Sequence, residues 1–439
     1  MITNENKKLA QWAMEFALKN GCQASRVSIY NGSSSSFEIR DMKMDRLQQA
    51  SENSLVIHLF VDGRFGSFST NRLDKKELET LITNGIESTR YLAVDESRML
   101  ADPARYYKGG KPDLQLFDKK LYEVNPDDKV AIARAAAEEV LGKDERIISV
   151  DSSYSDGEGS SYRLISNGFE GESKSTWFSV SASVSIKGEG EARPQDYWYD
   201  SALFYDKLTK TGIGAKALER VLRKLGQKKA KSGKYTMVVD PMNVGNLLSP
   251  MLSALYGSAL QQKNSFLMDK LDTKVASDLF TLRDEPHAIG ANGSRYFDNE
   301  GVATEPRTVF DKGVLKTYFI DTYNGKKMDI APTISAPSRL ILTPGDKDLN
   351  GLVADIKQGI LVTGFNGGNS NSSTGDFSYG IEGFLIEDGK LTQPVNEMNV
   401  TGNMVTLWNS LVAVGNDPQP NRSWQIPSLV FEGVDFSGL

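Results

Sequence analysis

The chain has 439 residues, a formal net charge of −6 and a sequence pI near 5.3. Its basic residues are scattered among a larger number of acidic ones, so it lacks the basic footprint with which a general DNA- or RNA-binding protein contacts phosphate. It contains only two histidines and one cysteine, none at ligand or triad spacing. The chain therefore cannot by itself assemble a histidine- or cysteine-based catalytic centre or zinc site, because these need several such groups together.

The sequence also bears on where the protein works. No segment approaches the roughly 18 consecutive apolar residues of a membrane helix, and residues 1–8 lack the apolar core of a signal peptide. A secreted protein with this much loop would more often carry paired cysteines than the lone Cys22. We expect a cytoplasmic protein that does not contact a membrane.

At about 150 residues per domain, a chain of this length predicts two or three domains. We expect an α+β, multidomain protein in which helix and antiparallel-sheet layers precede a β-rich C-terminal domain. The predicted units are an N-terminal α+β domain (1–108), a central segment with hairpins and a helix (109–232) and the β-rich C-terminal domain (233–439).

The predicted elements follow from periodicity. Apolar residues at spacings of three and four predict helices over residues 6–19, 75–91, 126–141 and 211–229. Short runs rich in β-formers predict strands over residues 26–30, 35–40, 46–51, 55–61, 66–70, 147–154, 162–166 and 177–186. The Ser, Gly and Glu residues between the central strands predict exposed hairpins, and residues 101–127 have the composition of a linker.

From residue 235 onward the pattern changes to buried strands with glycine-rich connections. Strands are predicted over residues 235–239, 309–310, 315–320, 339–342, 360–363, 381–387 and 429–434.

The residue types that usually carry catalysis are poorly placed. His58 lies inside an apolar strand run and His287 follows a proline in a loop, so neither is expected to bind a metal. No Gly-x-Ser-x-Gly elbow or phosphate-binding loop occurs, and Cys22 is most simply a buried, inert thiol.

Carboxylates are the remaining catalytic candidates. Asp298, Glu300, Asp321 and Asp376 each lie beside a turn or strand end. A pair of them could divide acid and base roles or hold magnesium. Solvated turn acids would give the same pattern, and we favour that interpretation.

The most unusual segment is residues 364–380, which is rich in Gly, Asn and Ser. Such a loop can adopt almost any turn, and its amides and hydroxyls could satisfy a ligand's polar groups. It ends with aromatic residues beside small ones at the entry to a strand, a composition suited to holding an extended peptide. A disordered hairpin tip is the alternative.

Several segments of the C-terminal half carry a family resemblance. They are residues 264–274 (NSFLMDKLDTK), 297–308 (FDNEGVATEPRT), 313–322 (GVLKTYFIDT), 375–383, 387–395 and 402–417, the last ending in Val414-Gly415-Asn416-Asp417. In these the chain resembles the TldD/PmbA family, also called modulators of DNA gyrase, and specifically its PmbA (TldE) branch. The N-terminal part is similar to the family's first domain, with less specific matches at residues 37–40 and 63–69.

The resemblance implies a missing metal site. TldD-type members present a His-Glu-x-x-x-His helix and a cysteine near the C-terminus. The counterpart helix is expected over residues 244–260, where the ligand positions fall at Ser249, Pro250 and Ala254. Residues 240–260 contain no histidine, glutamate or cysteine, and residues 417–439 contain no cysteine. We expect no metal or other cofactor in this chain, and a metal only in a TldD-type partner.

The resemblance further implies a non-catalytic subunit that joins a TldD-like metallopeptidase, or forms a homodimer, and helps to bind and enclose unfolded peptides. Strand addition at an exposed edge would hold such peptides. The predicted groove residues are Gly375, Asp376, Phe377, Ser378, Tyr379 and Asn403. Two alternatives stay open: an independent carboxylate-dependent hydrolase, and a regulatory protein-binding module of the gyrase-modulator type.

Overall fold

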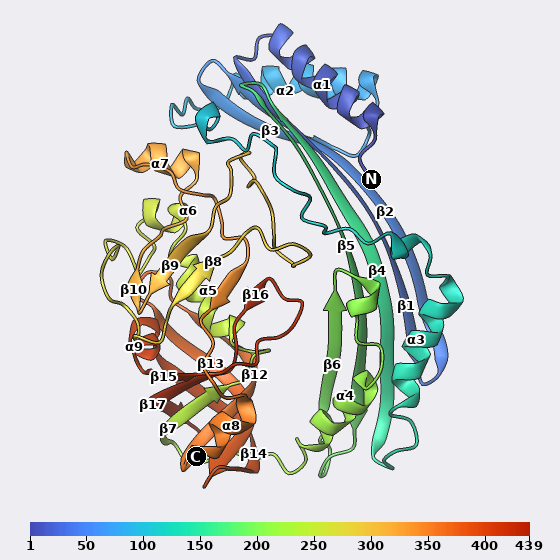
Figure 1. The fold of residues 1–439 in the computed structure, drawn as a ribbon, viewed down its shortest axis with the longest axis vertical. Coiled ribbons are helices and arrows are strands. Elements are labelled where there is room, and N and C mark those ends of the chain that lie inside the picture. Colours follow the sequence, from blue (N-terminus) through green and yellow to red (C-terminus); the bar gives the residue numbers. More distant parts are fainter.

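The computed structural model describes all residues 1–439 and contains three β-sheets with helices on their faces (Figure 1). The predicted α+β, multidomain class is confirmed. No helix is both long enough and apolar enough to cross a membrane.

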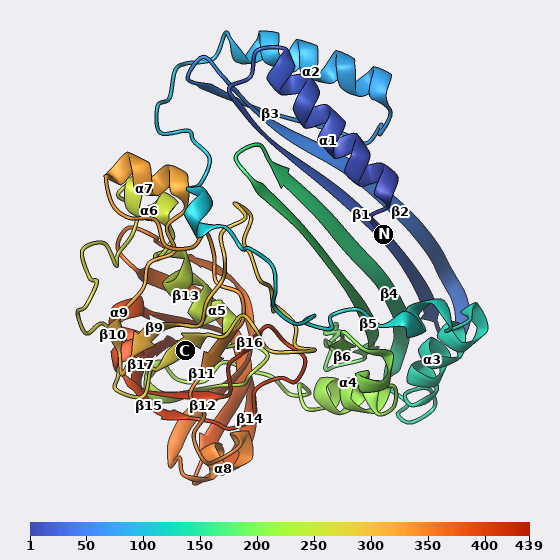
Figure 2. The ribbon, with the colours of Figure 1, turned by 45° about the horizontal axis from the view of Figure 1, so that its top comes forward.

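The N-terminal half is built on one antiparallel sheet of order β3-β2-β1-β4-β5-β6. Its strands are β1 (Ala24–Arg40), β2 (Lys43–Val61), β3 (Arg64–Thr70), β4 (Ile147–Ile165), β5 (Phe169–Ile186) and β6 (Gln195–Ala202). Two pairs of helices pack against one face of the sheet, and the first pair lies along its outer side in Figure 2. They are α1 (Asn4–Lys19) with α2 (Lys75–Thr89), and α3 (Pro126–Glu138) with α4 (Ile213–Leu222). Residues 1–108 and 109–232 both supply strands to this sheet, so the boundary between them stays a prediction.

Several predicted breaks in this sheet are wrong. The four short strands between residues 26 and 61 are two long ones, β1 and β2, and the hairpin expected between residues 154 and 162 lies inside β4. Serine and glycine have low strand propensity, but here β1 is paired along its whole length on both sides, with β2 and β4. The ladder of backbone hydrogen bonds outweighs local propensity in such a strand.

The linker expected over residues 101–127 is largely irregular, with the short 3₁₀ turns η1 (Pro103–Arg105) and η2 (Lys119–Tyr122). A third such turn, η3 (Tyr205–Lys207), precedes α4.

The C-terminal domain contains a closed barrel. Its strands are β7 (Gly233–Val239), β12 (Gln358–Ser370), β13 (Asp376–Glu387), β14 (Lys390–Asn403) and β17 (Leu429–Ser437), and β14 pairs with β17 to close the ring. The short strand β15 (Leu411–Val414) extends the barrel sheet beside β17.

A five-stranded sheet of order β10-β9-β8-β11-β16 lies against the barrel. Its short strands are β8 (Leu282–Asp284), β9 (Arg307–Asp311), β10 (Val314–Leu315), β11 (Leu340–Leu342) and β16 (Trp424–Gln425). The strand predicted over residues 315–320 is mostly absent, because only Leu315 of that range lies in a strand and Phe319 forms an isolated bridge with Tyr256. The domain's helices are α5 (Gly245–Ser253), α6 (Gly257–Gln261), α7 (Thr322–Met328), α8 (Leu349–Ala354) and α9 (Met404–Asn409).

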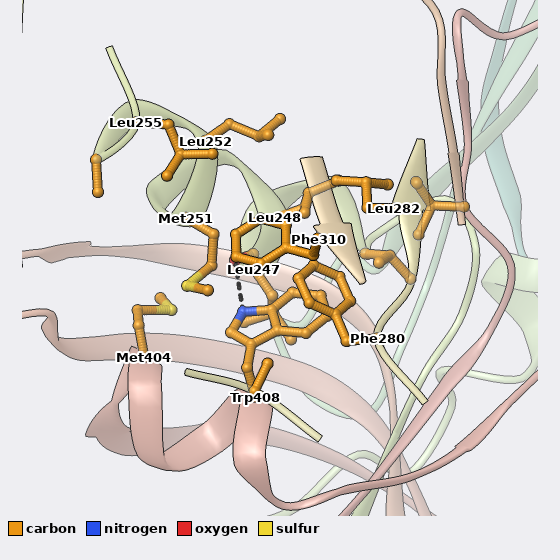
Figure 3. Packing of buried hydrophobic residues seen from close by; sticks show 14 of the residues in the cluster. Leu247, Leu248, Met251, Leu252, Leu255, Phe280, Leu282, Phe310, Met404 and Trp408 are labelled. Carbon is orange, nitrogen blue, oxygen red and sulfur yellow. Dashed lines mark hydrogen bonds between the residues drawn. The ribbon is translucent and has the colours of Figure 1, made fainter. Parts of the chain in front are cut away.

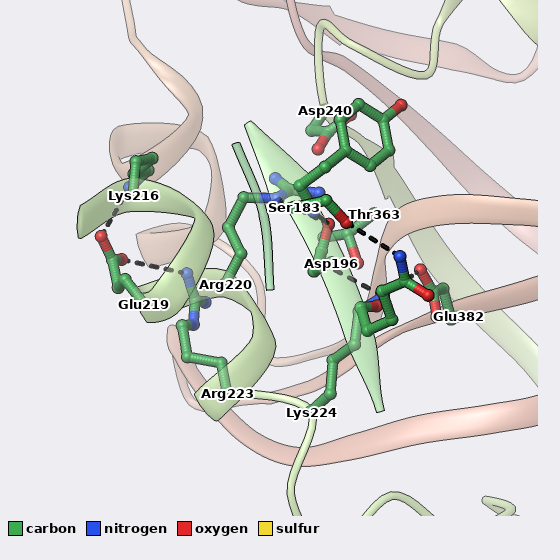
Figure 4. A network of polar contacts seen from close by, with 12 residues as sticks. Ser183, Asp196, Lys216, Glu219, Arg220, Arg223, Lys224, Asp240, Thr363 and Glu382 are labelled. Carbon is green, nitrogen blue, oxygen red and sulfur yellow. Dashed lines mark hydrogen bonds and ion pairs between the residues drawn. The ribbon is translucent and has the colours of Figure 1, made fainter. Parts of the chain in front are cut away.

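The largest hydrophobic core lies where α5, α9 and the five-stranded sheet meet (Figure 3). Trp408 is fully buried there between Phe280 and Phe431, with ring centroids 4.4 and 5.6 Å away. Its indole N–H donates to the carbonyl of Leu247 at 3.4 Å, which ties α9 to α5. A separate set of buried ion pairs joins α4 and β6 to the barrel (Figure 4).

Candidate functional site

The positions that resemble metal-ligand positions lie on and just after α5. The helix buries Leu247, Leu248, Met251 and Leu252 against the core (Figure 3), so its remaining face looks outward. Ser249 is exposed and Pro250 is half-buried on that face. Ala254 is buried at the helix end, where its carbonyl accepts a hydrogen bond from the Ser265 hydroxyl at 2.6 Å.

The helix predicted over residues 244–260 is in fact two helices. The first ends at Ser253, and α6 begins at Gly257 after an extended Tyr256. The Gly257 amide donates to the Phe319 carbonyl at 2.8 Å, and a Cβ on Gly257 would come within 2.9 Å of Asn324. Because the Gly257 amide bonds to Phe319, it cannot donate to a carbonyl of α5, and the helix does not continue through residue 257. Pro250 also lacks an N–H for the helix ladder.

The chemistry of these three positions does not suit a metal ion. They offer a hydroxyl, a pyrrolidine ring and a methyl group in place of the imidazole and carboxylate groups that bind zinc. Nowhere in the structure do three or more His, Cys, Asp or Glu side chains come together in a group that could hold a metal.

The segment 364–380, expected to be a loop, is largely a β-hairpin. Strands β12 and β13 continue to Ser370 and from Asp376, with two register shifts, and only residues 371–375 form the turn. Both serine hydroxyls of the turn, Ser372 and Ser373, donate to Asn264 at 2.6 and 2.5 Å. The Phe266 amide donates to the Ser372 carbonyl at 3.0 Å. These contacts hold the turn against the segment after α6 and satisfy polar groups that the sequence suggested were free.

The six predicted groove residues divide into two groups. Gly375 adopts a φ of 81° beside the Phe266 ring, and Phe377 is buried. Asn403 caps α9 and its amide donates to Asp376 at 2.9 Å, which lowers the pKa of that carboxyl. These four residues hold the hairpin in shape. Ser378 is exposed and Tyr379 is half-buried. The peptide groove itself stays a prediction.

Sequence reasoning missed an open strand edge in the same hairpin. Strand β7 pairs with β12 only from Gly359 to Val362, whereas β13 pairs with β12 as far as Ser370. Residues 364–370 of β12 therefore have no strand paired with them on the side away from β13. Gly367 and Gly368 have φ values of 79° and 96° at a register shift there. A glycine pair within a strand pattern is a known signal of a bulge and could have indicated this feature.

The four candidate carboxylates have structural partners. Asp298 is 1% exposed and accepts the amides of Glu300, Val302 and Ser335 at 2.8–3.0 Å. Glu300 accepts the amide and hydroxyl of Thr322 at 2.9 Å, and Asp321 caps α7. Burial raises the pKa of Glu300.

The histidines and the cysteine are also accounted for by packing. His58 accepts from Arg26 Nε at 3.0 Å, and His287 lies 3.1 Å from the Thr304 hydroxyl. Burial, followed by the nearby charges of Arg26 and Arg163, lowers the pKa of His58 to about 3. Burial raises the pKa of Cys22 to about 11.

The chain combines an antiparallel sheet covered by helices with a closed barrel and a short five-stranded sheet. Three family models match the chain: domain 1 of the PmbA/TldA metallopeptidases over residues 26–89, their central domain over 119–225 and their C-terminal domain over 232–438. The chain belongs to the TldD/PmbA family.

Individual relatives agree with this assignment. A solved structure from Bacteroides thetaiotaomicron, named as a proposed modulator of DNA gyrase, is 73% identical, with a TM-score of 0.98 and 100% of both chains covered. The metalloprotease PmbA homologue of Haemophilus influenzae is 27% identical, over 99% of this chain and 96% of its own length. TldE from Thermococcus kodakarensis has the same fold, with a TM-score of 0.83, 20% identity and coverage of 98% of this chain and 100% of its own.

Proposed function

We propose that the chain is a metal-free, non-catalytic subunit of a TldD/PmbA-type metallopeptidase, which helps to bind and enclose unfolded peptides in the cytoplasm. The observation that carries this proposal is the outward face of α5. Ser249 and Pro250 lie on this face, and Ala254 follows the helix. The family resemblance implies that these three residues stand at the ligand positions of a TldD-type helix. The catalytic metal then belongs to a TldD-like partner subunit.

The open edge of β12 supports a role in peptide binding. An extended peptide can add to such an edge through main-chain hydrogen bonds, with alternate side chains selecting the sequence. Residues 366–369 on this edge are exposed, and Ser378 and Tyr379 lie on the neighbouring strand. The Tyr379 ring packs against Phe365 at 5.6 Å, which places an aromatic surface beside the edge. A partner subunit that covered this edge would enclose a peptide held there.

The proposal is tested by reconstitution with a TldD-like protein and an unfolded peptide. The pair should cleave the peptide faster than the partner alone, while this chain alone should not cleave it. Asn369→Trp places a bulky group on the exposed edge and should slow turnover by the pair. Lys390→Trp is the matched control, at an exposed position where β14 begins. If Asn369→Trp and deletion of residues 369–373 both leave turnover unchanged, the assignment of the hairpin is wrong.

A second candidate function is a regulatory protein-binding module. It is favoured by the 73% identical structure that is named as a proposed modulator of DNA gyrase. Stoichiometric capture of purified gyrase, with no effect of this chain on peptide cleavage by a TldD-like protein, would support it over the peptidase role. The oligomeric mass of the chain with and without that protein distinguishes a homodimer from a heterodimer.

A further inference from the structure

A cavity of about 600 Å³ lies between the N-terminal sheet and the C-terminal domain, away from the β12 hairpin. Its walls come from β1, β4 and β5, from the linker after η1, and from the segment that precedes Glu300. The cationic residues in its lining are Arg163, Arg295, Lys111 and Lys174, and the aromatic residues are Tyr30, Tyr107, Tyr296 and Phe297.

The cations of this cavity have no carboxylate partner. Arg163 is 7% exposed, and its three nitrogens donate to the Ser28 hydroxyl, the Asp298 carbonyl and the Tyr30 hydroxyl at 3.0–3.2 Å. Arg295 likewise donates to the Ser338 hydroxyl and to two carbonyls. All these acceptors are neutral, so neither guanidinium group forms an ion pair, although the buried carboxylates of Asp298 and Asp284 act on Arg295 at longer range.

The two lysines lie at the rim. Lys111 Nζ is 5.3 Å from the centre of the Tyr296 ring, and Lys174 Nζ is 5.4 Å from that of Phe117. Both lysines are exposed, and ring faces leave an ammonium group free to donate to an anion.

The acids in the lining are already engaged. Asp298 accepts three backbone amides, Glu172 pairs with Lys7 at 2.5 Å, and Asp113 accepts the Gln115 amide at 2.9 Å. The lining therefore carries four cations against three carboxylates, and no cation is paired with a carboxylate of the lining. Beside them is a stacked aromatic wall, in which the Tyr107 and Tyr296 rings lie 5.1 Å apart at 11°.

The cavity also opens along the inner face of the sheet. A neighbouring hollow of about 350 Å³ shares Tyr30, Ser161 and Ser173 with it and continues past Gly32 and Gly159. Small side chains there leave room for an extended chain that ends in the cavity.

We infer that this cavity binds the C-terminal carboxylate of an unfolded peptide, with Arg163 and the two rim lysines facing the carboxylate and the aromatic wall contacting the last side chain. This inference deepens the proposed function and rests on it. A hydrogen bond between a cationic donor and a carboxylate is stronger than one to a neutral acceptor, and an amidated terminus lacks the negative charge of the carboxylate.

Binding of three labelled peptides to the purified full chain tests the inference. One is a short unstructured peptide ending in phenylalanine with a free carboxylate, the second is its C-terminal amide, and the third is an amide with an internal aspartate that restores the net charge. The free acid should bind at least about tenfold more tightly than either amide, a factor that one charged hydrogen bond supplies.

Variants locate the effect in the cavity. The double variant Lys111→Gln, Lys174→Gln changes only exposed side chains and should remove most of the preference for the free acid. Lys8→Gln, Lys143→Gln is the matched control at exposed lysines elsewhere. Arg163→Gln should abolish the preference, and the rim variant carries the test if Arg163→Gln does not fold.

Equal affinity for the three peptides, or an unchanged preference in the rim variant, would overturn the inference. Neither result would contradict the proposed function. That proposal is contradicted by a different result, namely that the chain does not stimulate peptide cleavage by a TldD-like protein.

Discussion

Lys224, in the turn after α4, and Glu382 of β13 form an ion pair of 2.7 Å between the central segment and the barrel (Figure 4). Lys224 also lies 3.2 Å from Asp196 of β6, which in turn pairs with Arg220 at 3.2 Å. The side chains of these four residues are 5–17% exposed, so the network lies largely out of water. It fixes how the N-terminal sheet and the C-terminal domain sit relative to one another.

Removal of Lys224 should therefore destabilise the protein. Lys224→Met leaves the buried carboxylates of Asp196 and Glu382 short of a partner, and breaking a buried pair in this way costs about 3–5 kcal/mol. Urea unfolding measures the change. Lys216→Met removes an exposed pair on α4 and should change stability by less than about 0.5 kcal/mol. Equal effects of the two changes would contradict a structural role for the network.

Substitution of Asn403 should lower the stability of the protein, because its side chain is engaged in structural hydrogen bonds. Asn403→Ala removes the cap of α9 and the hydrogen bonds to Asp376 and to the Thr374 carbonyl. Loss of a cap of this kind costs about 1–2 kcal/mol. Thermal or urea unfolding should show this loss, whereas Ser378→Ala on the exposed side of β13 should unfold like the wild type. A fully stable Asn403→Ala variant would show that the cap is not needed.

The lowered pKa of His58 predicts that the stability of the protein falls at acidic pH. Its pKa in the folded protein is lowered to about 3, so below its ordinary value of about 6.5 the unfolded chain takes up a proton that the folded chain does not. Stability is lost as the pH falls from about 6.5 towards 3. Between pH 7 and 5 the wild type should lose up to about 2 kcal/mol more than His58→Gln. Unfolding at both pH values checks this, and parallel losses in the two proteins would refute it.

Cys22 should be unreactive in the folded protein. Its pKa is raised to about 11 by burial, so little thiolate exists near neutral pH, and thiolate is the form that reacts. Mass spectrometry after treatment with iodoacetamide at pH 8 should find the native chain unmodified and the urea-unfolded chain modified once. Rapid labelling of the native chain would indicate an accessible thiol.

Local sequence pattern predicted most helices of the N-terminal half closely, although the helix predicted over residues 211–229 is only Ile213–Leu222. The helix predicted over residues 6–19 is Asn4–Lys19, and that over residues 75–91 is Lys75–Thr89, because each has a capped start and one apolar face. The strands were predicted too short, since the serine and glycine residues within β1 and β4 are held by pairing with neighbours distant in sequence. No local pattern carries that information.

In the candidate site, too, some features can be inferred from the sequence and others depend on tertiary contacts. The assignment of Ser249, Pro250 and Ala254 as degenerate ligand positions rests on family resemblance and stays a prediction. The break after Ser253 could not be predicted, because it depends on the contact between Gly257 and the Phe319 carbonyl. The free edge of β12 also depends on where β7 ends, which is a property of the assembled barrel.

Metal analysis of the purified chain, alone and with a TldD-like protein, tests the central claim most directly. The positions on α5 predict no stoichiometric zinc in the chain alone and one metal ion per heterodimer in the pair, with peptide cleavage only in the pair. One zinc ion per subunit in the chain alone, with cleavage of an unfolded peptide, would contradict the assignment of a non-catalytic subunit.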